Sequence, residues 1–420
     1  MSQKVSVALH TLGCKLNQAE TETLAGQLIE AGCQLVAFGE EADVYIVNTC
    51  TVTHVADRKS RHLLRMARRR NPDALVVATG CYAQRSPQEL AQIAQLVLNN
   101  EQKAHIVELV GEKLGFSPGA KGKFIFGVDG RVRALVKVQD GCDDFCSYCI
   151  VPRVRGRENC LPVDEVIGEV KARVAAGYRE VVLTGTKIGS YSYDGVSLKQ
   201  LVERILGETS VERLRLSSLQ PQEISTGLIS LWRDRRLCPH FHLALQSGSG
   251  SVLGRMRRRY CIDDYQRVMS LIKEAVPDAA ITTDVIVGFP GESDSEFEDG
   301  YRFCGETGFA NMHVFPFSLR PGTLAAKMPG QVEEGLKKVR GHKMLELARR
   351  SANRFRERFL GQVMEVLWEK ETSLGSGVYS GLTGNYIRAF TKSDVSLTNR
   401  VVPVKLLEMR GQGVWGELAK

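Results

Sequence analysis

Short apolar runs alternate with helix-like segments through the first part of the chain. In chain order the pattern is an apolar run, a helix, a run, a helix and a run: 5–9, 17–32, 44–47, a helix through Arg65, and 75–79. This βαβαβ order predicts an open parallel sheet covered by helices, which belongs to the α/β class.

Three cysteines, Cys14, Cys50 and Cys81, each come just after one of these apolar runs. The loops that follow parallel strands converge on one edge of a sheet, so cysteines far apart in sequence can meet there. The alternative is three unrelated buried thiols, which is the ordinary interpretation of any single cysteine. Their repeated position at strand ends favours a shared site.

The middle of the chain repeats a strand-then-helix pattern. Six strand-like runs are present, and each of the first five is followed by a segment of helical character: 134–138, 181–184, 214–217, 241–245, 281–287 and 311–315. This pattern predicts an incomplete (βα)6 parallel barrel. In such barrels the chemistry lies in the loops after the strands.

The last part of the chain has a different pattern. A basic amphipathic stretch over 332–361 leads into short strand-like runs separated by Gly, Ser and Asn: 363–368, 378–380, 386–390, 401–407 and 414–418. These runs predict a small antiparallel β-barrel. Residues 117–130 are rich in glycine and lysine, which indicates a linker between the first part of the chain and the middle part. The predicted parts are therefore a first domain, a linker, a barrel and a terminal module: 1–116, 117–131, 132–361 and 362–420.

Composition narrows the class of protein. Of the 420 residues, 43% are hydrophobic and 25% charged, and no apolar run approaches the length needed to span a bilayer. The first residues lack the regions of a secretory signal, which predicts a cytoplasmic protein with no membrane association. The eleven cysteines are then better interpreted as metal ligands and buried thiols than as a disulfide framework. The formal charge of +8 fits either a polyanionic partner or a solvated basic surface.

A compact cysteine triplet, Cys142-x-x-x-Cys146-x-x-Cys149, lies on the first loop of the predicted barrel. Three thiolates hold three corners of a 4Fe-4S cluster and leave one iron open. In radical enzymes S-adenosylmethionine chelates that open iron through its amino and carboxylate groups. A zinc site or a plain electron-transfer cluster is the alternative, although structural zinc usually takes four protein ligands. The remaining cysteines are assigned no role: Cys33, Cys160, Cys238, Cys261 and Cys304.

The segment GCDDFCSYCIVP over 141–152, with Arg155 and Arg157 after it, resembles the signature of the methylthiotransferase family of radical S-adenosylmethionine enzymes. The N-terminal cysteines lie in blocks similar to those of the same family, over 11–17, 47–52 and 79–83. The resemblance covers nearly all the chain. It is greatest for the branch that modifies N6-threonylcarbamoyladenosine beside the anticodon of tRNA, through blocks at 17–22, 56–61, 245–249, 255–260, 284–292 and 313–318.

The resemblance implies two 4Fe-4S clusters, held by Cys142, Cys146 and Cys149 and by the first-domain triplet. It implies two molecules of S-adenosylmethionine per turnover. One methylates a cluster-bound sulfur, and the other generates the radical that abstracts hydrogen from carbon 2 of the adenine, which then takes the methylthio group. It further implies a C-terminal RNA-binding barrel of the TRAM type, tRNA as partner, an external electron donor such as flavodoxin or ferredoxin, and a monomer. The alternatives are the same chemistry on an isopentenyl-type adenosine or a ribosomal-protein aspartate, or a non-catalytic iron-sulfur RNA-binding protein.

Loops after the predicted barrel strands supply the candidate S-adenosylmethionine contacts. They are Tyr148, Thr184, Gly185, Ser217, Gln246, Asp284 and Gly288. Taken alone, the glycine-rich segments 184–189 and 288–292 could be ordinary tight turns. Their place in a barrel marked by the cysteine triplet favours binding.

A basic run over 58–70 follows Cys50 and has helical spacing. Arg58, Arg61, Arg65 and Arg68 fall on one face, with Leu64 and Ala67 offset toward the core. A solvated charged face is the ordinary interpretation of such a run. Together with the resemblance, the run predicts a track for the RNA backbone, which Arg257 and its neighbours Arg255, Arg258 and Arg259 would extend.

Overall fold

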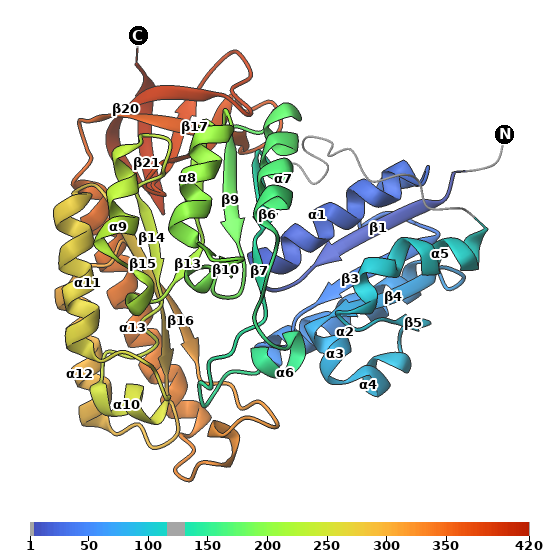
Figure 1. The fold of residues 1–420 in the computed structure, drawn as a ribbon, viewed down its shortest axis with the longest axis horizontal. Coiled ribbons are helices and arrows are strands. Elements are labelled where there is room, and N and C mark those ends of the chain that lie inside the picture. The colour runs from blue at the N-terminus through green and yellow to red at the C-terminus, as the bar shows by residue number, and fades with distance from the viewer. Residues whose placement is uncertain (1–3, 116–130, 420) are drawn as a thin grey trace.

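The computed structural model describes residues 4–115 and 131–419 (Figure 1). The first layer is a five-stranded sheet in the order β2-β1-β3-β4-β5, and all its strands are parallel. Its strands are β1 (Ser6–Thr11), β2 (Gln34–Val36), β3 (Val44–Thr49), β4 (Leu75–Gly80) and β5 (Leu96–Val97). Its helices are α1 (Lys15–Glu30), α2 (His54–Arg70), α3 (Cys81–Arg85), α4 (Pro87–Ala91) and α5 (Ile106–Leu114). The predicted open parallel sheet is confirmed, and β2 and β5 extend it at both edges.

The central strand β3 explains why helices must cover both faces of this sheet. All six of its residues, VYIVNT, are buried. A strand without an exposed alternating face lies between two apolar layers, as parallel strands usually do. Two separate clusters provide these layers, one containing Tyr45 and Leu64 and the other Ile46 and Leu28.

Six parallel strands form the central unit in chain order, as predicted. They are β6 (Arg133–Lys137), β9 (Glu180–Thr184), β12 (Arg213–Leu216), β14 (His240–Leu243), β15 (Ala280–Val287) and β16 (Asn311–Pro316). The short β13 (Ser218–Leu219) continues β12 and pairs with β14. Helices follow the strands: α7 (Val163–Ala175), α8 (Leu198–Glu208), α9 (Thr226–Ile229), α11 (Ile262–Ala275), α12 (Asp294–Thr307) and α13 (Glu334–Glu357). The first and last strands are not paired with each other, so the barrel is partial.

Two small apolar clusters join the first layer to this barrel. Ala19 of α1 packs with Leu135 and Val182 of β6 and β9. Cys81 of α3 packs with Ile150, which precedes α6 (Val151–Arg155), and with Val154 of that helix. The second cluster places a cysteine of the first triplet against the segment that directly follows Cys149.

The C-terminal strands close into a five-stranded barrel in the order β17-β18-β19-β21-β20. They are β17 (Val363–Glu371), β18 (Val378–Thr383), β19 (Arg388–Lys392), β20 (Val401–Arg410) and β21 (Gly413–Leu418). The small barrel is confirmed, but β19 and β21 are parallel rather than antiparallel. Strand direction cannot alternate all the way around a closed barrel with an odd number of strands, so one neighbouring pair must be parallel.

This barrel, red in Figure 1, covers the end of the central barrel at which the strands begin. Arg213 and Arg215, on β12, donate hydrogen bonds to the carbonyls of Leu382 and Gly384. The side-chain amide of Asn385 donates to the carbonyl of Asp278, just before β15. The N-terminal layer lies beside the central barrel, next to β6 (Figure 1), with α1 packed on β6 and β9.

The predicted linker lies almost entirely outside the described residues. Within the described part of the chain, no helix has the length and apolar character of a membrane span.

Candidate functional site

Tight backbone packing brings the loops of the first cysteine triplet together. Gly13 has a φ of +99°, and a Cβ there would lie 2.8 Å from the Sγ of Cys50. Only glycine therefore lets the Cys14 loop approach the Cys50 loop this closely. Burial raises the pKa of the Cys50 thiol to about 12, and the neighbouring Cys81 and Cys14 thiols add to the rise. The sheet edge thus gathers all three thiols, as their position after the strands predicts.

The second triplet lies on the loop between β7 (Gln139–Asp140) and α6. Gly141, with a φ of +70°, allows this loop to turn against the backbone of Arg157, whose carbonyl oxygen would lie 2.0 Å from a Cβ. Burial raises the pKa of Cys142 to about 11 and that of Cys149 to about 12, and the Cys146 thiol contributes in both cases.

These two thiol sets suit iron-sulfur clusters. Cys50, Cys81 and Cys142 are buried, whereas Cys14 is exposed. Thiols gathered so closely are stable as thiolates when cations lie among them, and iron provides those cations. A backbone N–H and a guanidinium also point at sulfur: the Asp144 N–H lies 3.4 Å from the Sγ of Cys142, and Nη1 of Arg258 lies 3.1 Å from the Sγ of Cys146. Hydrogen bonds to sulfur are among the contacts that tune such clusters.

A cavity of about 640 Å³ lies between the two triplets. Cys14 and Cys50 line it from the N-terminal layer, and Cys149 lines it from the barrel. Six of the seven predicted S-adenosylmethionine contacts also line it: Tyr148, Thr184, Gly185, Ser217, Gln246 and Asp284. The hydroxyl of Ser217 is buried without a hydrogen-bond partner in the described structure, which fits a polar ligand in this cavity.

Gly288 is the predicted contact that does not line the cavity. Its N–H donates to Oε2 of Glu292 at 2.6 Å, and its backbone packs against Lys337. The segment 288–292 therefore forms a turn at the end of β15, which is the alternative that the sequence left open for this glycine-rich segment.

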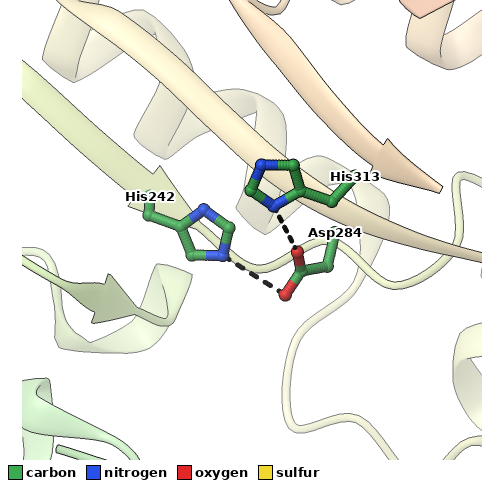
Figure 2. A group of neighbouring side chains, drawn as sticks. All are labelled: His242, Asp284 and His313. Carbon is green, nitrogen blue, oxygen red and sulfur yellow. Dashed lines mark hydrogen bonds and ion pairs between the residues drawn. The ribbon is translucent and has the colours of Figure 1, made fainter. Parts of the chain in front are cut away.

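Asp284 lies in the cavity wall, but its carboxylate is already shared between two imidazoles (Figure 2). Nε2 of His242 lies 3.2 Å from Oδ2, and Nδ1 of His313 lies 3.1 Å from Oδ1. Although burial opposes it, these hydrogen bonds hold the pKa of Asp284 well below its ordinary value. Two histidines and a carboxylate are also a set that a divalent transition metal can use, and their ligand atoms lie within 4.8 Å of one another.

The sequence prediction missed His242 as a cavity residue. His240 and His242 alternate on β14, and residues two apart on a strand share one face. That spacing was the available signal. The prediction also missed Lys187, whose Nζ pairs with Oδ2 of Asp144 at 3.1 Å and so braces the Cys142 loop.

The predicted RNA track is exposed along most of its length. Arg58, Arg65 and Arg68 are exposed on α2, whereas Leu64 and Ala67 are buried beneath them. Arg61 is held instead, because it pairs with Glu89 at 2.9 Å and hydrogen-bonds the hydroxyl of Tyr82.

The proposed extension of this track differs from residue to residue. Arg257 is exposed. Arg255 pairs with Glu296 at 2.8 Å, Arg259 pairs with Asp144 at 3.3 Å, and Arg258 contacts Cys146. In this group, therefore, Arg257 alone presents a guanidinium without a carboxylate or sulfur contact in the described structure.

Comparisons with known proteins agree with this architecture. Residues 6–99 match the model of the uncharacterized protein family UPF0004, and residues 136–304 match that of the Radical SAM superfamily. The structure of the radical S-adenosylmethionine methyltransferase TsrM from Kitasatospora setae is similar, with a TM-score of 0.55 over 77% of this chain and 74% of that one. At 16% identity this likeness concerns the fold alone.

Sequence relatives match over nearly the whole chain. The threonylcarbamoyladenosine tRNA methylthiotransferase MtaB of Bacillus subtilis (strain 168) is 38% identical, over 96% of this chain and 94% of that protein. The tRNA-2-methylthio-N(6)-dimethylallyladenosine synthase of Acetivibrio thermocellus is 34% identical, over 100% of this chain and 92% of that protein. With both domain models matched and the two thiol sets facing one cavity, the chain belongs to the methylthiotransferase family of radical S-adenosylmethionine enzymes.

Proposed function

We propose that this protein attaches a methylthio group to carbon 2 of N6-threonylcarbamoyladenosine beside the anticodon of tRNA. The observation that carries the proposal is the cavity between the two cysteine triplets, because a base bound there faces both at once. The identity to the MtaB proteins supports the choice of nucleoside.

In this proposal Cys142, Cys146 and Cys149 hold one 4Fe-4S cluster, and Cys14, Cys50 and Cys81 hold the second. When bound, the first cluster and S-adenosylmethionine supply a radical able to abstract hydrogen, and the second cluster supplies the sulfur. The chain's own groups bind and orient: Tyr148, Thr184, Gly185, Ser217 and Gln246 surround S-adenosylmethionine on the barrel side.

Water must be kept from the reacting atoms, and the apolar part of the cavity wall can exclude it. Its apolar part includes Ile150, Ile286, Phe315 and Phe317. Apolar walls around a radical prevent its capture by solvent or by stray polar groups.

The tRNA backbone would lie along the exposed arginines of α2, Arg58, Arg65 and Arg68, with Arg257 as a further contact. We assign the parts 1–116, 132–361 and 362–420 the roles of second-cluster domain, radical barrel and TRAM-like RNA-binding barrel. In this proposal the protein is a cytoplasmic monomer, and an external donor such as flavodoxin or ferredoxin supplies its electrons.

Nucleoside mass spectrometry of tRNA from a strain that lacks this gene tests the substrate. Methylthio-threonylcarbamoyladenosine should disappear, its unmethylthiolated precursor should accumulate, and a plasmid copy should restore the product. Persistence of the product in a strain without a related gene would exclude this nucleoside.

Two measurements on the same strain separate the alternatives. Loss of the methylthio-isopentenyl nucleoside from the same digest would assign that substrate, and an unmodified aspartate in the mass spectrum of the ribosomal proteins would assign a protein substrate. Reconstituted protein that carries both clusters but does not cleave S-adenosylmethionine when reduced would be an RNA-binding protein without activity.

A further inference from the structure

A second cavity, of about 520 Å³, lies beside β16, the last strand of the central barrel, near the end where the strands begin, and Leu345 and Arg349 on its α13 side are exposed. Strands β14, β15 and β16 form one wall, α13 forms another, and the turn between β18 and β19 covers it from the C-terminal barrel. Five basic side chains line this cavity: Lys15, Arg133, Arg349, Arg356 and Arg388. Among the described residues no aspartate or glutamate lines it.

Only part of this positive charge is compensated. Glu369 pairs with Arg133 at 2.9 Å and with Arg388 at 3.1 Å. Lys15 and Arg349 have no carboxylate within ion-pair distance in 4–115 and 131–419. The ammonium of Lys15 lies 5.7 Å from the ring centre of Tyr386.

The electrostatic effect of these cations is visible on Tyr386. Burial alone would raise the pKa of its hydroxyl, but the nearby Lys15, Arg133 and Arg215 lower it. The His240 ring stacks on that of Tyr386, with ring centres 4.4 Å apart. Burial lowers the pKa of His240 well below its ordinary value, and Arg215 and Lys15 add to this effect. The cavity therefore favours a bound anion.

The two cavities share a wall. Lys15, His242 and His313 line both of them. Asp284 hydrogen-bonds both imidazoles (Figure 2). Lys15, which has no carboxylate partner among the described residues, is the cation at this junction. A base held between the cysteine triplets would place its substituent beside these three side chains, which border the cationic cavity.

We infer that the second cavity receives the negatively charged end of the substituent on the adenine, a carboxylate, and that Lys15 is its main specificity contact. This inference rests on the proposed function. A threonylcarbamoyl group ends in a free carboxylate and a hydroxyl, which suit an ammonium and imidazoles. A dimethylallyl group is a neutral hydrocarbon, and it would occupy a cationic cavity without compensating any charge.

A phosphate of the RNA backbone is the other source of an anion. A phosphate is joined to nucleosides on both sides, so it would bring a continuous chain into the barrel. The substituent is a chain end and needs only the passage beside Lys15. Burial of His240 and His242 in the cavity wall agrees with the smaller ligand.

Kinetics with a neutralised substrate test the inference. The reconstituted full-length enzyme is given anticodon stem-loop RNA carrying threonylcarbamoyladenosine, or the same RNA with that carboxylate as its methyl ester. Wild type should prefer the acid by roughly 10- to 100-fold in kcat/KM, the range expected for a charge-assisted contact. Lys15→Gln should lower the preference, so that the ratio of kcat/KM for the acid to kcat/KM for the ester falls to about one.

Lys15 follows Cys14 directly, so iron content and cleavage of S-adenosylmethionine are measured on the variant as well. Arg349→Gln, far from all six cysteines in sequence, is the second variant and should weaken the preference several-fold. Arg354→Gln removes a charge from the same helix outside the cavity and should leave the preference unchanged.

The outcomes separate the possibilities. An equal loss on acid and ester in both variants would indicate a backbone phosphate and overturn the inference. Equal wild-type rates on acid and ester would overturn it while leaving the proposed function intact. Transfer only to stem-loops with a dimethylallyl substituent would overturn the inference and the proposed nucleoside together.

Discussion

The Arg155 guanidinium lies 3.0 Å from the Glu20 carboxylate and joins the helix after the second cysteine loop to the first helix of the N-terminal layer. Both side chains are nearly buried, with 3% and 11% of their surfaces exposed. Arg155 also pairs with Asp140 at 2.8 Å, and Glu20 with Lys103. The two cysteine triplets are thus held in place by one network of charges that crosses the domain boundary.

Glu20→Gln should destabilise this boundary. It leaves Arg155 with only one carboxylate in a buried setting, so we expect a loss of about 3 kcal/mol in the free energy of unfolding. Urea denaturation followed by far-UV circular dichroism measures the loss. Glu40→Gln, at an exposed site without a side-chain ion pair in the described residues, is the matched control. Equal stability of the two variants would show that the network does not hold the domains.

A buried pair under the C-terminal barrel should make stability depend on acid pH. Although burial opposes it, Arg215 and Arg213 lower the pKa of Glu180 to about 2. The pKa of an ordinary glutamate is about 4.3. The ionised carboxylate therefore stabilises the fold above that pH, and this contribution to stability is lost as the pH falls toward 2. Between pH 6 and pH 3 the Tm of thermal unfolding should therefore fall less steeply for the double variant Glu180→Gln, Arg215→Met than for wild type. Parallel curves would contradict this assignment.

Iron content should separate ligand cysteines from ordinary thiols. Anaerobically reconstituted wild type is expected to bind about eight irons, and Cys146→Ala about four. Cys160→Ala is the control, since its sulfur accepts a hydrogen bond from the Ser192 N–H at 3.4 Å and lies outside both triplets. Full iron content in Cys146→Ala would remove Cys146 from the ligand set.

Arg258 should tune the cluster beside it. Its guanidinium, 3.1 Å from the Cys146 sulfur, stabilises added negative charge, so Arg258→Gln should make the reduction potential more negative. Redox titration monitored by electron paramagnetic resonance measures this shift. Arg258→Lys should recover part of it, and Arg257→Gln, at the exposed neighbour, should cause none. A potential that does not change in Arg258→Gln would make the contact structural only.

Salt dependence should distinguish the arginines of α2. Neutralising Arg65 or Arg68 should reduce the slope of log affinity for tRNA against log salt by about 0.9 each, the value for one released counterion. Arg61→Gln should change the slope less, because Glu89 and Tyr82 already hold this side chain. Filter binding across a salt series supplies the slopes. Unchanged slopes for Arg65 and Arg68 would remove α2 from the RNA surface.

By itself the sequence determined the order of strands and helices, the two cysteine triplets and the family. Apolar periodicity and the spacing of Cys142, Cys146 and Cys149 involve residues that are close together in the sequence, so they can be recognised without the structure. The position of cysteines after parallel strands was enough to predict that Cys14, Cys50 and Cys81 meet, because that consequence follows from sheet geometry.

Only the tertiary structure decided which charged side chains have ion-pair or hydrogen-bond partners and which do not. Nothing in the sequence near Arg61, Arg258 or Asp284 reveals their partners, which lie 28, 112 and 42 residues away in Glu89, Cys146 and His242. The cationic cavity is likewise built from distant parts of the chain, since Lys15, His242 and Tyr386 all line it. Side-chain electrostatics depends on distance in space, and only the folded chain sets that distance.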